Sequence, residues 1–180
     1  NDSGLSIGAA AFLEWQKGNN ISIHSPYLNN IGMPDSVAQP KDDIIKKTAE
    51  IILANGIVGI CNDNGEAGPR ALGHRSLIAL PNSKELAKRM SMEVKKREWY
   101  RPVAPIMLSS VAEKVVGEPL HHLSKFMLLD CEVKEEFNND LAGVIHAKQT
   151  ARIQTISNEA DNPFMFQLLT YLHEKHKILA

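Results

Sequence analysis

Short β-branched segments alternate with segments of helical periodicity along this chain, and this alternation limits the folds open to it. Residues 41–55 carry apolar side chains at helical spacing, with Asp42 and Asp43 in the first turn and Gly56 just past the end, so they predict a helix. Further helices are predicted over residues 4–18, over 83–98, and from Asn162 onward. Strands are predicted over residues 57–62, 77–81, 103–108, 126–133 and 151–156.

The alternation has no strict βαβ rhythm, and that decides the fold class. It predicts an α/β fold (α+β by strict classification) in which a mixed twisted sheet has helices on its faces. With 180 residues, of which 43% are hydrophobic, the chain can bury a sizeable core. It contains no apolar run of the roughly 18 residues that a membrane helix needs, so we expect no membrane association. Cys61 and Cys131 lie far apart in apolar surroundings, which favours a cytoplasmic, reducing setting.

The net charge of −1 argues against a general nucleic-acid binder, but the charges are unevenly distributed. Residues 68–101 contain nine Lys and Arg residues against three Glu, a local excess of six positive charges, and they include five of the six arginines of the chain. Arginine offers a fork of donors that matches phosphate and carboxylate groups. The segment is therefore either a site for a small anion or a solvated basic face.

Two motifs within or next to this segment favour the anion site. Residues 68–76 read GPRALGHRS and place Arg70 and Arg75 on a turn between two short strands. Residues 95–105 read KKREWYRPVAP and add Lys95, Arg97 and Arg101 from a helix end and the stretch after it. If that stretch folds back over the turn, five cations surround one pocket, and their mutual repulsion indicates a bound phosphate or polyphosphate.

These motifs carry a family resemblance. The chain resembles the nodulation-protein type of carbamoyltransferase and the cephem and nebramycin antibiotic carbamoyltransferases, which carry GPRALGxRS, then KxRExFRPxAP, then HxDGTARxQT. The third motif is present in altered form as HAKQTARIQT over residues 146–155. The sequence departs from the family in having Asp63-Asn64 where Gly-Arg is usual, and Lys148-Gln149 where Asp-Gly is usual.

The resemblance implies a YrdC-like C-terminal domain that activates carbamoyl phosphate with ATP, accompanied by Mg²⁺, to carbamoyl-adenylate. The carbamoyl group then passes to a hydroxyl of a sugar or secondary metabolite. By match to the motifs, the catalytic residues are Arg70, Lys95 and Arg101. The residues that hold substrate and nucleotide are the same three together with Arg75, Arg97 and Arg152, and His74 is a weaker candidate. Arg75 has an alternative role as a structural partner of a carboxylate such as Glu66.

The resemblance also divides the chain. Residues 1–18 resemble the end of the N-terminal transferase domain, residues 19–40 are a linker or crossing, and residues 41–180 form the YrdC-like domain, truncated at its C-terminal end. Asp2 matches a ligand of an iron-type metal, whose site is complete only in a full-length N-terminal domain. We therefore expect that domain of the same polypeptide to be a partner, alongside small-molecule substrates, and we expect the chain alone to have partial or no activity.

Two other functions fit the basic segment. One is a threonylcarbamoyl-AMP synthase-like enzyme that modifies transfer RNA, which would require threonine. The other is a non-catalytic module that binds nucleotides or RNA through phosphate contacts, whose affinity would fall steeply with salt. The GPRALGHRS motif argues against the first, and the acidic remainder of the chain argues against the second.

Overall fold

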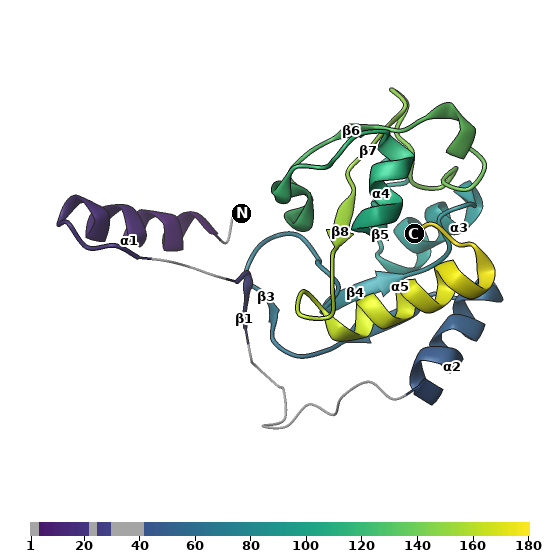
Figure 1. The fold of residues 1–180 in the computed structure, drawn as a ribbon, viewed down its shortest axis with the longest axis horizontal. Helices are drawn as coiled ribbons and strands as arrows, with labels where there is room; N and C mark the ends of the chain where they lie inside the picture. The colour runs from purple at the N-terminus through teal and green to yellow at the C-terminus, as the bar shows by residue number, and fades with distance from the viewer. Residues whose placement is uncertain (1–3, 22–24, 30–41) are drawn as a thin grey trace.

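The computed structural model describes residues 4–21, 25–29 and 42–180, with helices packed around pairs of short strands (Figure 1). The α-helices are α1 (Gly4–Gln16), α2 (Asp42–Leu53), α3 (Lys84–Arg89), α4 (Ser109–Val116) and α5 (Pro163–His176). The strands are β1 (Tyr27–Asn29), β2 (Val58–Cys61), β3 (Gly65–Glu66), β4 (Arg75–Ile78), β5 (Ile106–Leu108), β6 (Cys131–Glu132), β7 (Thr150–Ala151) and β8 (Gln154–Ile156). A π-helix η1 (Met90–Val94) continues α3, and two 3-10 helices are η2 (His122–Phe126) and η3 (Glu135–Phe137).

The described strands form four separate two-stranded sheets. β2–β4, β1–β3 and β6–β7 are antiparallel, whereas β5–β8 is parallel, with Ile106 opposite Gln154. The α/β class and the mixture of strand directions are confirmed, but the prediction of one mixed sheet is wrong for the described residues. Strands of two to four residues are too short to build a continuous ladder, so packing joins the pairs in place of hydrogen bonds.

Most predicted segments are found with shifted ends. Asn162 caps α5 by accepting a hydrogen bond from the backbone N–H of Met165, as expected of Asn before a Pro that starts a helix. The predicted strand over residues 126–133 is wrong, because a 3-10 helix extends to Phe126 and only Cys131–Glu132 is extended. Met127 adopts a left-handed conformation there, with φ of 54°, which interrupts the strand.

The core consists of two apolar clusters on opposite sides of the β5–β8 pair. One cluster packs α2 against α5 through Ile45, Ile52 and Leu168, and it includes Ile106. The other lies around α4 and includes the next residue of β5, Met107. Consecutive residues of β5 therefore face different clusters, as the two-residue period of a strand requires. This central position lets β5 and β8 carry residues of the site.

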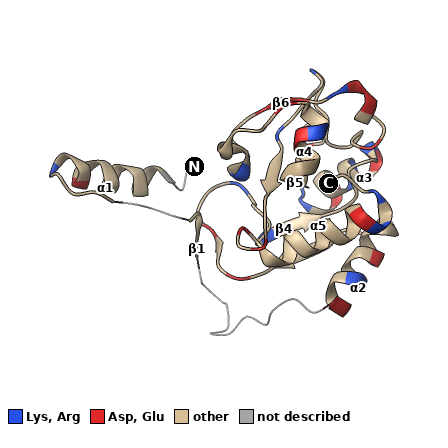
Figure 2. Ribbon diagram, in the orientation of Figure 1, with Lys and Arg blue, Asp and Glu red and all other residues tan. Residues whose placement is uncertain are grey.

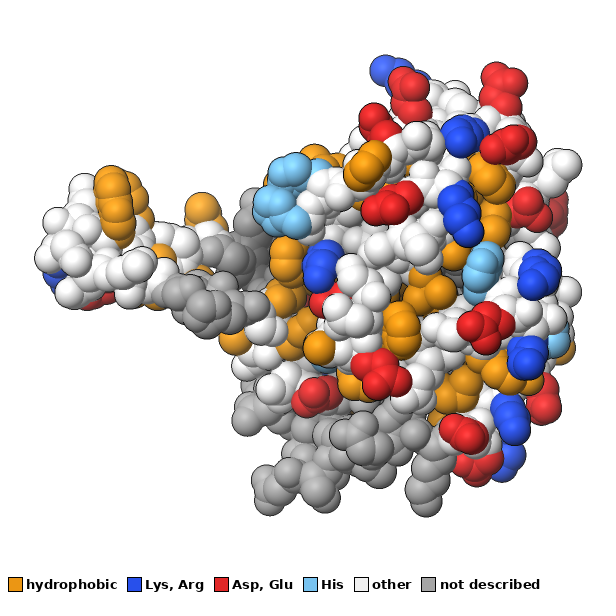
Figure 3. All heavy atoms as spheres, viewed as in Figure 1, with side chains coloured by type: hydrophobic (Ala, Val, Ile, Leu, Met, Phe, Trp, Pro, Cys, Tyr) orange, Lys and Arg blue, Asp and Glu red, His pale blue; other side chains and the backbone are white. Residues whose placement is uncertain are grey.

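Helix α1 stands apart from the packed body in the ribbon (Figure 1). Four of its large hydrophobic side chains are more than half exposed, namely Leu5, Phe12, Leu13 and Trp15. Figure 3 shows hydrophobic side chains on the surface of this helix. Its only charge is Glu14, near its C-terminal end, whereas Lys, Arg, Asp and Glu are interspersed over the body (Figure 2). Among the described helices, none has the length and apolar character needed to cross a bilayer.

Candidate functional site

A pocket of about 320 Å³ lies among β4, α3, the segment before β5, and the start of β8. Its basic side chains come from three separate stretches of chain: Arg70, then Lys95 and Arg97, then Arg152. Apolar residues such as Leu80, Leu86 and Val103 form much of the rest of the wall. No Asp or Glu is among the described residues that line it. The pocket thus combines an apolar wall with unbalanced positive charge, which suits an anionic ligand.

The loop that carries Arg70 is organised by the carboxylate of Glu66 in β3. Glu66 Oε1 accepts backbone N–H groups from Leu72 at 2.6 Å, His74 at 3.0 Å and Arg75 at 3.2 Å. Burial alone would raise the pKa of this carboxyl, but the backbone donors prevail and hold the pKa below its ordinary value. Glu66 is therefore ionised at neutral pH, and its charge fixes the path of residues 72–75.

Further contacts hold the same loop from behind. The Leu72 carbonyl accepts hydrogen bonds from the Tyr27 hydroxyl at 3.1 Å and from Gln154 Nε2 at 2.9 Å. Gly73 adopts φ of +95°, and a Cβ added there would lie 3.0 Å from Asn162 Nδ2 and 3.0 Å from Met165 Cγ. Glycine is thus required at position 73 by conformation and by space. The loop is a rigid base from which the Arg70 side chain extends.

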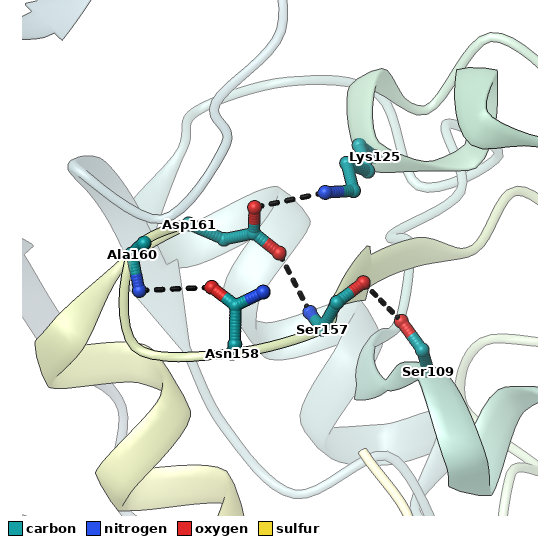
Figure 4. Close-up of polar contacts among 6 residues, drawn as sticks. All are labelled: Ser109, Lys125, Ser157, Asn158, Ala160 and Asp161. Atoms are coloured by element: carbon teal, nitrogen blue, oxygen red, sulfur yellow. Dashed lines mark hydrogen bonds and ion pairs between the residues drawn. The ribbon is translucent and has the colours of Figure 1, made fainter.

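The turn between β8 and α5 holds Asn162 next to Gly73. Asp161 accepts a hydrogen bond from the backbone N–H of Ser157 at 2.7 Å and pairs with Lys125 of η2 at 2.8 Å (Figure 4). Ser157 also shares a hydrogen bond of 2.9 Å with Ser109 at the start of α4. Burial alone would raise the pKa of Asp161, but its Lys125 and backbone donors lower it. The turn is therefore tied to two neighbouring elements.

Lys95 and Arg97 reach the pocket because the helix before them ends in a tight turn. The Lys95 N–H donates to Met90 and the Arg97 N–H to Ser91, while Lys96 between them is left-handed, with φ of 49°. Although much of the Lys95 side chain meets solvent, desolvation lowers its pKa, and the charge of Arg97 lowers it further. The negative charge of a bound anion would oppose both effects.

Arg97 also has a structural role in the described chain. Its Nη2 donates to Ser91 Oγ at 3.3 Å and to the Pro102 carbonyl at 3.1 Å, which joins η1 to the stretch before β5. Desolvation lowers the pKa of Arg97, and the charge of Arg101 lowers it further, while Glu98 acts in the opposite direction. Part of its donor capacity is therefore already used within the protein.

The third stretch of the pocket contributes His146, Arg152 and Gln154. Ile153, between the last two, is fully buried in the cluster around α4, so Arg152 and Gln154 share the opposite side of an extended chain. His146 Nδ1 lies 3.2 Å from Thr150 Oγ1 and 3.6 Å from Asp130 Oδ1. These contacts orient the imidazole at the edge of the pocket.

Three of the sequence-predicted residues do not line the pocket. The Arg75 guanidinium donates to the carbonyls of Asn62, at 2.8 Å, and His74, at 3.1 Å. His74 is buried, donates from Nδ1 to the Asn64 carbonyl at 2.6 Å, and stacks on the ring of Tyr27. Arg101 is exposed and forms an ion pair of 2.9 Å with Glu98. The alternative structural role of Arg75 is thus supported, although Glu66 contacts its backbone N–H and not its guanidinium.

The metal ligand expected at Asp2 lies outside the described residues. Within the described part of the chain, no three His, Cys, Asp or Glu side chains come together in a group that could hold a metal ion. The pocket residues themselves are basic or apolar, with only Ser76, His146 and Gln154 as polar exceptions. Their chemistry matches phosphate oxygens and not a metal ion.

Comparison with known families decides the affiliation. Residues 49–180 match the family described as carbamoyltransferase C-terminus, which covers more than half of the chain and every basic residue of the pocket. This chain belongs to the carbamoyltransferase family.

Several individual proteins are also similar to this chain. Nodulation protein U of Rhizobium tropici is 34% identical over 95% of this chain, and that of Sinorhizobium fredii is 32% identical over 95%. Nodulation protein NolO of Bradyrhizobium diazoefficiens is 36% identical over 73%. The chain covers 30%, 31% and 24% of these proteins respectively, so it spans less than a third of the length of these relatives. Helix α1 lies outside the segment that matches the family.

Several residues that shape the pocket of this chain are not predicted from its sequence. The sequence predicts Glu66 only as a partner for a guanidinium, Gln154 only as part of a motif, and Asn162 only as the start of a helix. The signal for Glu66 was its position six to nine residues before the N–H groups that it accepts, across a glycine-containing turn. No local pattern indicated that Asn162 Nδ2 would donate to the Gly73 carbonyl, at 3.3 Å, because 89 residues separate them.

Proposed function

We propose that this chain forms the activation site of an O-carbamoyltransferase, which uses carbamoyl phosphate and ATP to make carbamoyl-adenylate. In balanced form, carbamoyl phosphate, ATP and water yield carbamoyl-adenylate, pyrophosphate and inorganic phosphate. Water cleaves the bond between the carbamoyl unit and its phosphate, which releases inorganic phosphate and leaves carbamate. A carbamate oxygen then forms a bond to the α-phosphorus of ATP, and the bond from that phosphorus to pyrophosphate breaks. Every reactant and product except water carries negative charge, so the work of the protein is to hold anions together and to stabilise charge during transfer.

The observation that carries this proposal is the set of basic side chains around one pocket. Arg70, Lys95 and Arg152 form no ion pair with a carboxylate within the described residues, although all three line the pocket. Cations that share a partly desolvated pocket repel one another, and the pKa of Lys95 is lowered by desolvation and by the charge of Arg97, which also lines the pocket. A phosphate group among them would replace the repulsion with charge-assisted hydrogen bonds.

The geometry suggests different roles for these residues. We assign to Arg70, on its rigid loop, and to Arg152, on the extended chain before β8, bidentate hydrogen bonds to the phosphate of carbamoyl phosphate. We assign to Lys95 the neutralisation of charge on the nucleotide phosphates, with Mg²⁺ accompanying ATP. Arg75 and Arg101 do not line the pocket, so the proposal assigns them no phosphate contact. The apolar wall would accept the base or ribose.

Transfer to an acceptor lies beyond the described pocket. We propose that the acceptor is a hydroxyl of a sugar or secondary metabolite, and that it binds to another part of a longer polypeptide, since the relatives are about three times as long as this chain. We also propose a cytoplasmic setting, where ATP is abundant. The free thiols of both cysteines fit such a reducing compartment.

An assay for pyrophosphate release tests the activation step. We expect the chain, incubated with ATP and Mg²⁺, to release pyrophosphate only when carbamoyl phosphate is present, and calorimetry to show binding of each reactant. Arg70→Ala should reduce both signals, while Arg89→Ala, a matched change at an exposed arginine outside the pocket, should leave them intact. Absence of both binding and release in the parent chain would contradict the proposal.

The same assay separates the two other functions. A threonylcarbamoyl-AMP synthase-like enzyme would release pyrophosphate from ATP with bicarbonate and threonine, without carbamoyl phosphate. A nucleic-acid-binding module would bind RNA with an affinity that falls steeply between 50 mM and 200 mM salt, and it would release no pyrophosphate. Dependence of pyrophosphate release on carbamoyl phosphate alone supports the carbamoyltransferase.

A further inference from the structure

Gln154 is the most buried polar side chain of the pocket. It is only 3% exposed, yet it lines the cavity together with Arg152 and His146. Its backbone N–H donates to the Pro105 carbonyl at 2.9 Å, which fixes the start of β8 against the stretch before β5. A buried carboxamide in this position needs partners for both its nitrogen and its oxygen.

The orientation of the carboxamide follows from its neighbour. Gln154 Nε2 lies 2.9 Å from the Leu72 carbonyl, which can only accept hydrogen bonds, so the nitrogen must occupy that position. The side-chain oxygen is therefore the atom left for the cavity. Within the described residues, Gln154 Oε1 forms no hydrogen bond. Because Gln154 lines the pocket, this oxygen is an acceptor available to a ligand beside several cationic donors.

We propose that Gln154 Oε1 accepts a hydrogen bond from the amino group of a bound carbamoyl unit, and so selects carbamoyl phosphate over acyl phosphates of the same shape. The inference rests on the proposed function and deepens it by naming the group that recognises the substrate. The phosphate oxygens of the substrate can accept hydrogen bonds from Arg70 and Arg152. The amino group of its carbamoyl unit carries N–H donors, for which a cationic side chain offers no acceptor. Gln154 supplies the complementary acceptor, two residues from Arg152 on the same side of the chain.

Acetyl phosphate is the discriminating probe, because a methyl group replaces the amino group and leaves the phosphate unchanged. With acetyl phosphate bound, Gln154 Oε1 stays buried without a partner, which costs enough to weaken binding by roughly tenfold relative to carbamoyl phosphate. Inorganic phosphate serves as the third probe, because it reports on the cations alone.

The experiment is calorimetric titration of the chain with these three probes, freshly dissolved. The test variant is Gln154→Met, which keeps the length of the side chain but has no amide. It should fold, because the Leu72 carbonyl retains the Tyr27 hydroxyl as a donor. The matched control is Gln167→Met on α5, away from the pocket.

We expect the parent chain and Gln167→Met to prefer carbamoyl phosphate over acetyl phosphate by roughly tenfold. In Gln154→Met the preference should fall to about one, with the affinity for inorganic phosphate within about threefold of the parent. If the variant instead weakens all three probes by a common factor, Gln154 only supports the Arg70 loop, and the inference is wrong.

Two further outcomes keep the inference apart from the proposed function. Equal affinity of the parent chain for carbamoyl and acetyl phosphate, with clear binding of both, refutes the role of Gln154 and leaves the anion site intact, whether or not the variant folds. Failure of the parent chain to bind any of the three probes refutes the anion site itself.

The amino group of adenine is another donor that Gln154 Oε1 could meet, so the affinity for ATP is compared with that for inosine triphosphate, which lacks this group. If the parent chain prefers ATP and Gln154→Met removes the preference, Oε1 binds the base and the inference is overturned.

Discussion

Replacing Glu66 with Gln should loosen the loop that carries Arg70 without changing the shape of the side chain. Three backbone N–H groups donate to the carboxylate, at 2.6, 3.0 and 3.2 Å. Hydrogen bonds to a charged acceptor are worth about 1 kcal/mol more than those to a neutral one, which sets an upper limit of about 3 kcal/mol for the three. Because the carboxyl is only half-buried, solvent reduces this loss to about 2 kcal/mol.

For a chain of this length, that loss corresponds to a decrease in Tm of roughly 4–8 °C at neutral pH. Thermal unfolding followed by circular dichroism measures it, with Glu132→Gln as the control, because Glu132 is exposed and forms no hydrogen bond or ion pair through its side chain within the described residues. Glu66→Gln should also bind inorganic phosphate more weakly, since the loop that carries Arg70 is less rigid in this variant. A Tm within about 1 °C of the parent would refute the organising role of Glu66.

The pH dependence gives a second, independent check on Glu66. Its folded-state pKa is lowered from the ordinary value of 4.5, so its charge stabilises the fold fully above pH 4.5, and the stabilisation is lost as the pH falls through the lower folded pKa. The Tm gap between the parent chain and Glu66→Gln should therefore be constant above about pH 5 and should close in more acidic buffer. If the Tm difference persists at a pH where Glu66 is protonated, and thus neutral like Gln, then the shape of the side chain and not its charge holds the loop.

Three further predictions concern the loop, the cations and the turn after β8. Gly73→Ala should lower the free energy of unfolding by about 2 kcal/mol, measured by urea denaturation, because alanine resists φ of +95° and its Cβ meets two side chains at 3.0 Å. In phosphate titrations at low salt, Arg70→Ala should weaken binding at least about tenfold and Arg101→Ala less than about threefold, since only Arg70 lines the pocket. Asp161→Asn should reduce stability above pH 3.8, the ordinary pKa of the group, and this difference should vanish as the pH falls below the lowered folded pKa, as read from the pH dependence of urea midpoints.

Local sequence patterns were enough to predict much of the secondary structure. The helical spacing of apolar residues in residues 41–55 and the Asn-Pro start at Asn162 predicted α2 and α5, because both depend on contacts within one or two turns. The strand predicted over residues 126–133 failed, and α4 was not predicted. In both places the chain is decided by the neighbours that it packs against, and apolar composition alone does not distinguish a short strand from a helix.

The sequence by itself indicated which residues are candidates to bind anions, since Arg70, Lys95 and Arg152 belong to motifs whose chemistry is readable without a structure. Only the tertiary structure decided which cations share a pocket: Arg152 joins Arg70 and Lys95, while Arg75 and Arg101 face other partners. The same holds for Gln154, whose orientation depends on a carbonyl 82 residues away. Local spacing encodes turns and helix faces, but contacts between distant segments depend on how the two core clusters pack, and that packing is a property of the whole chain.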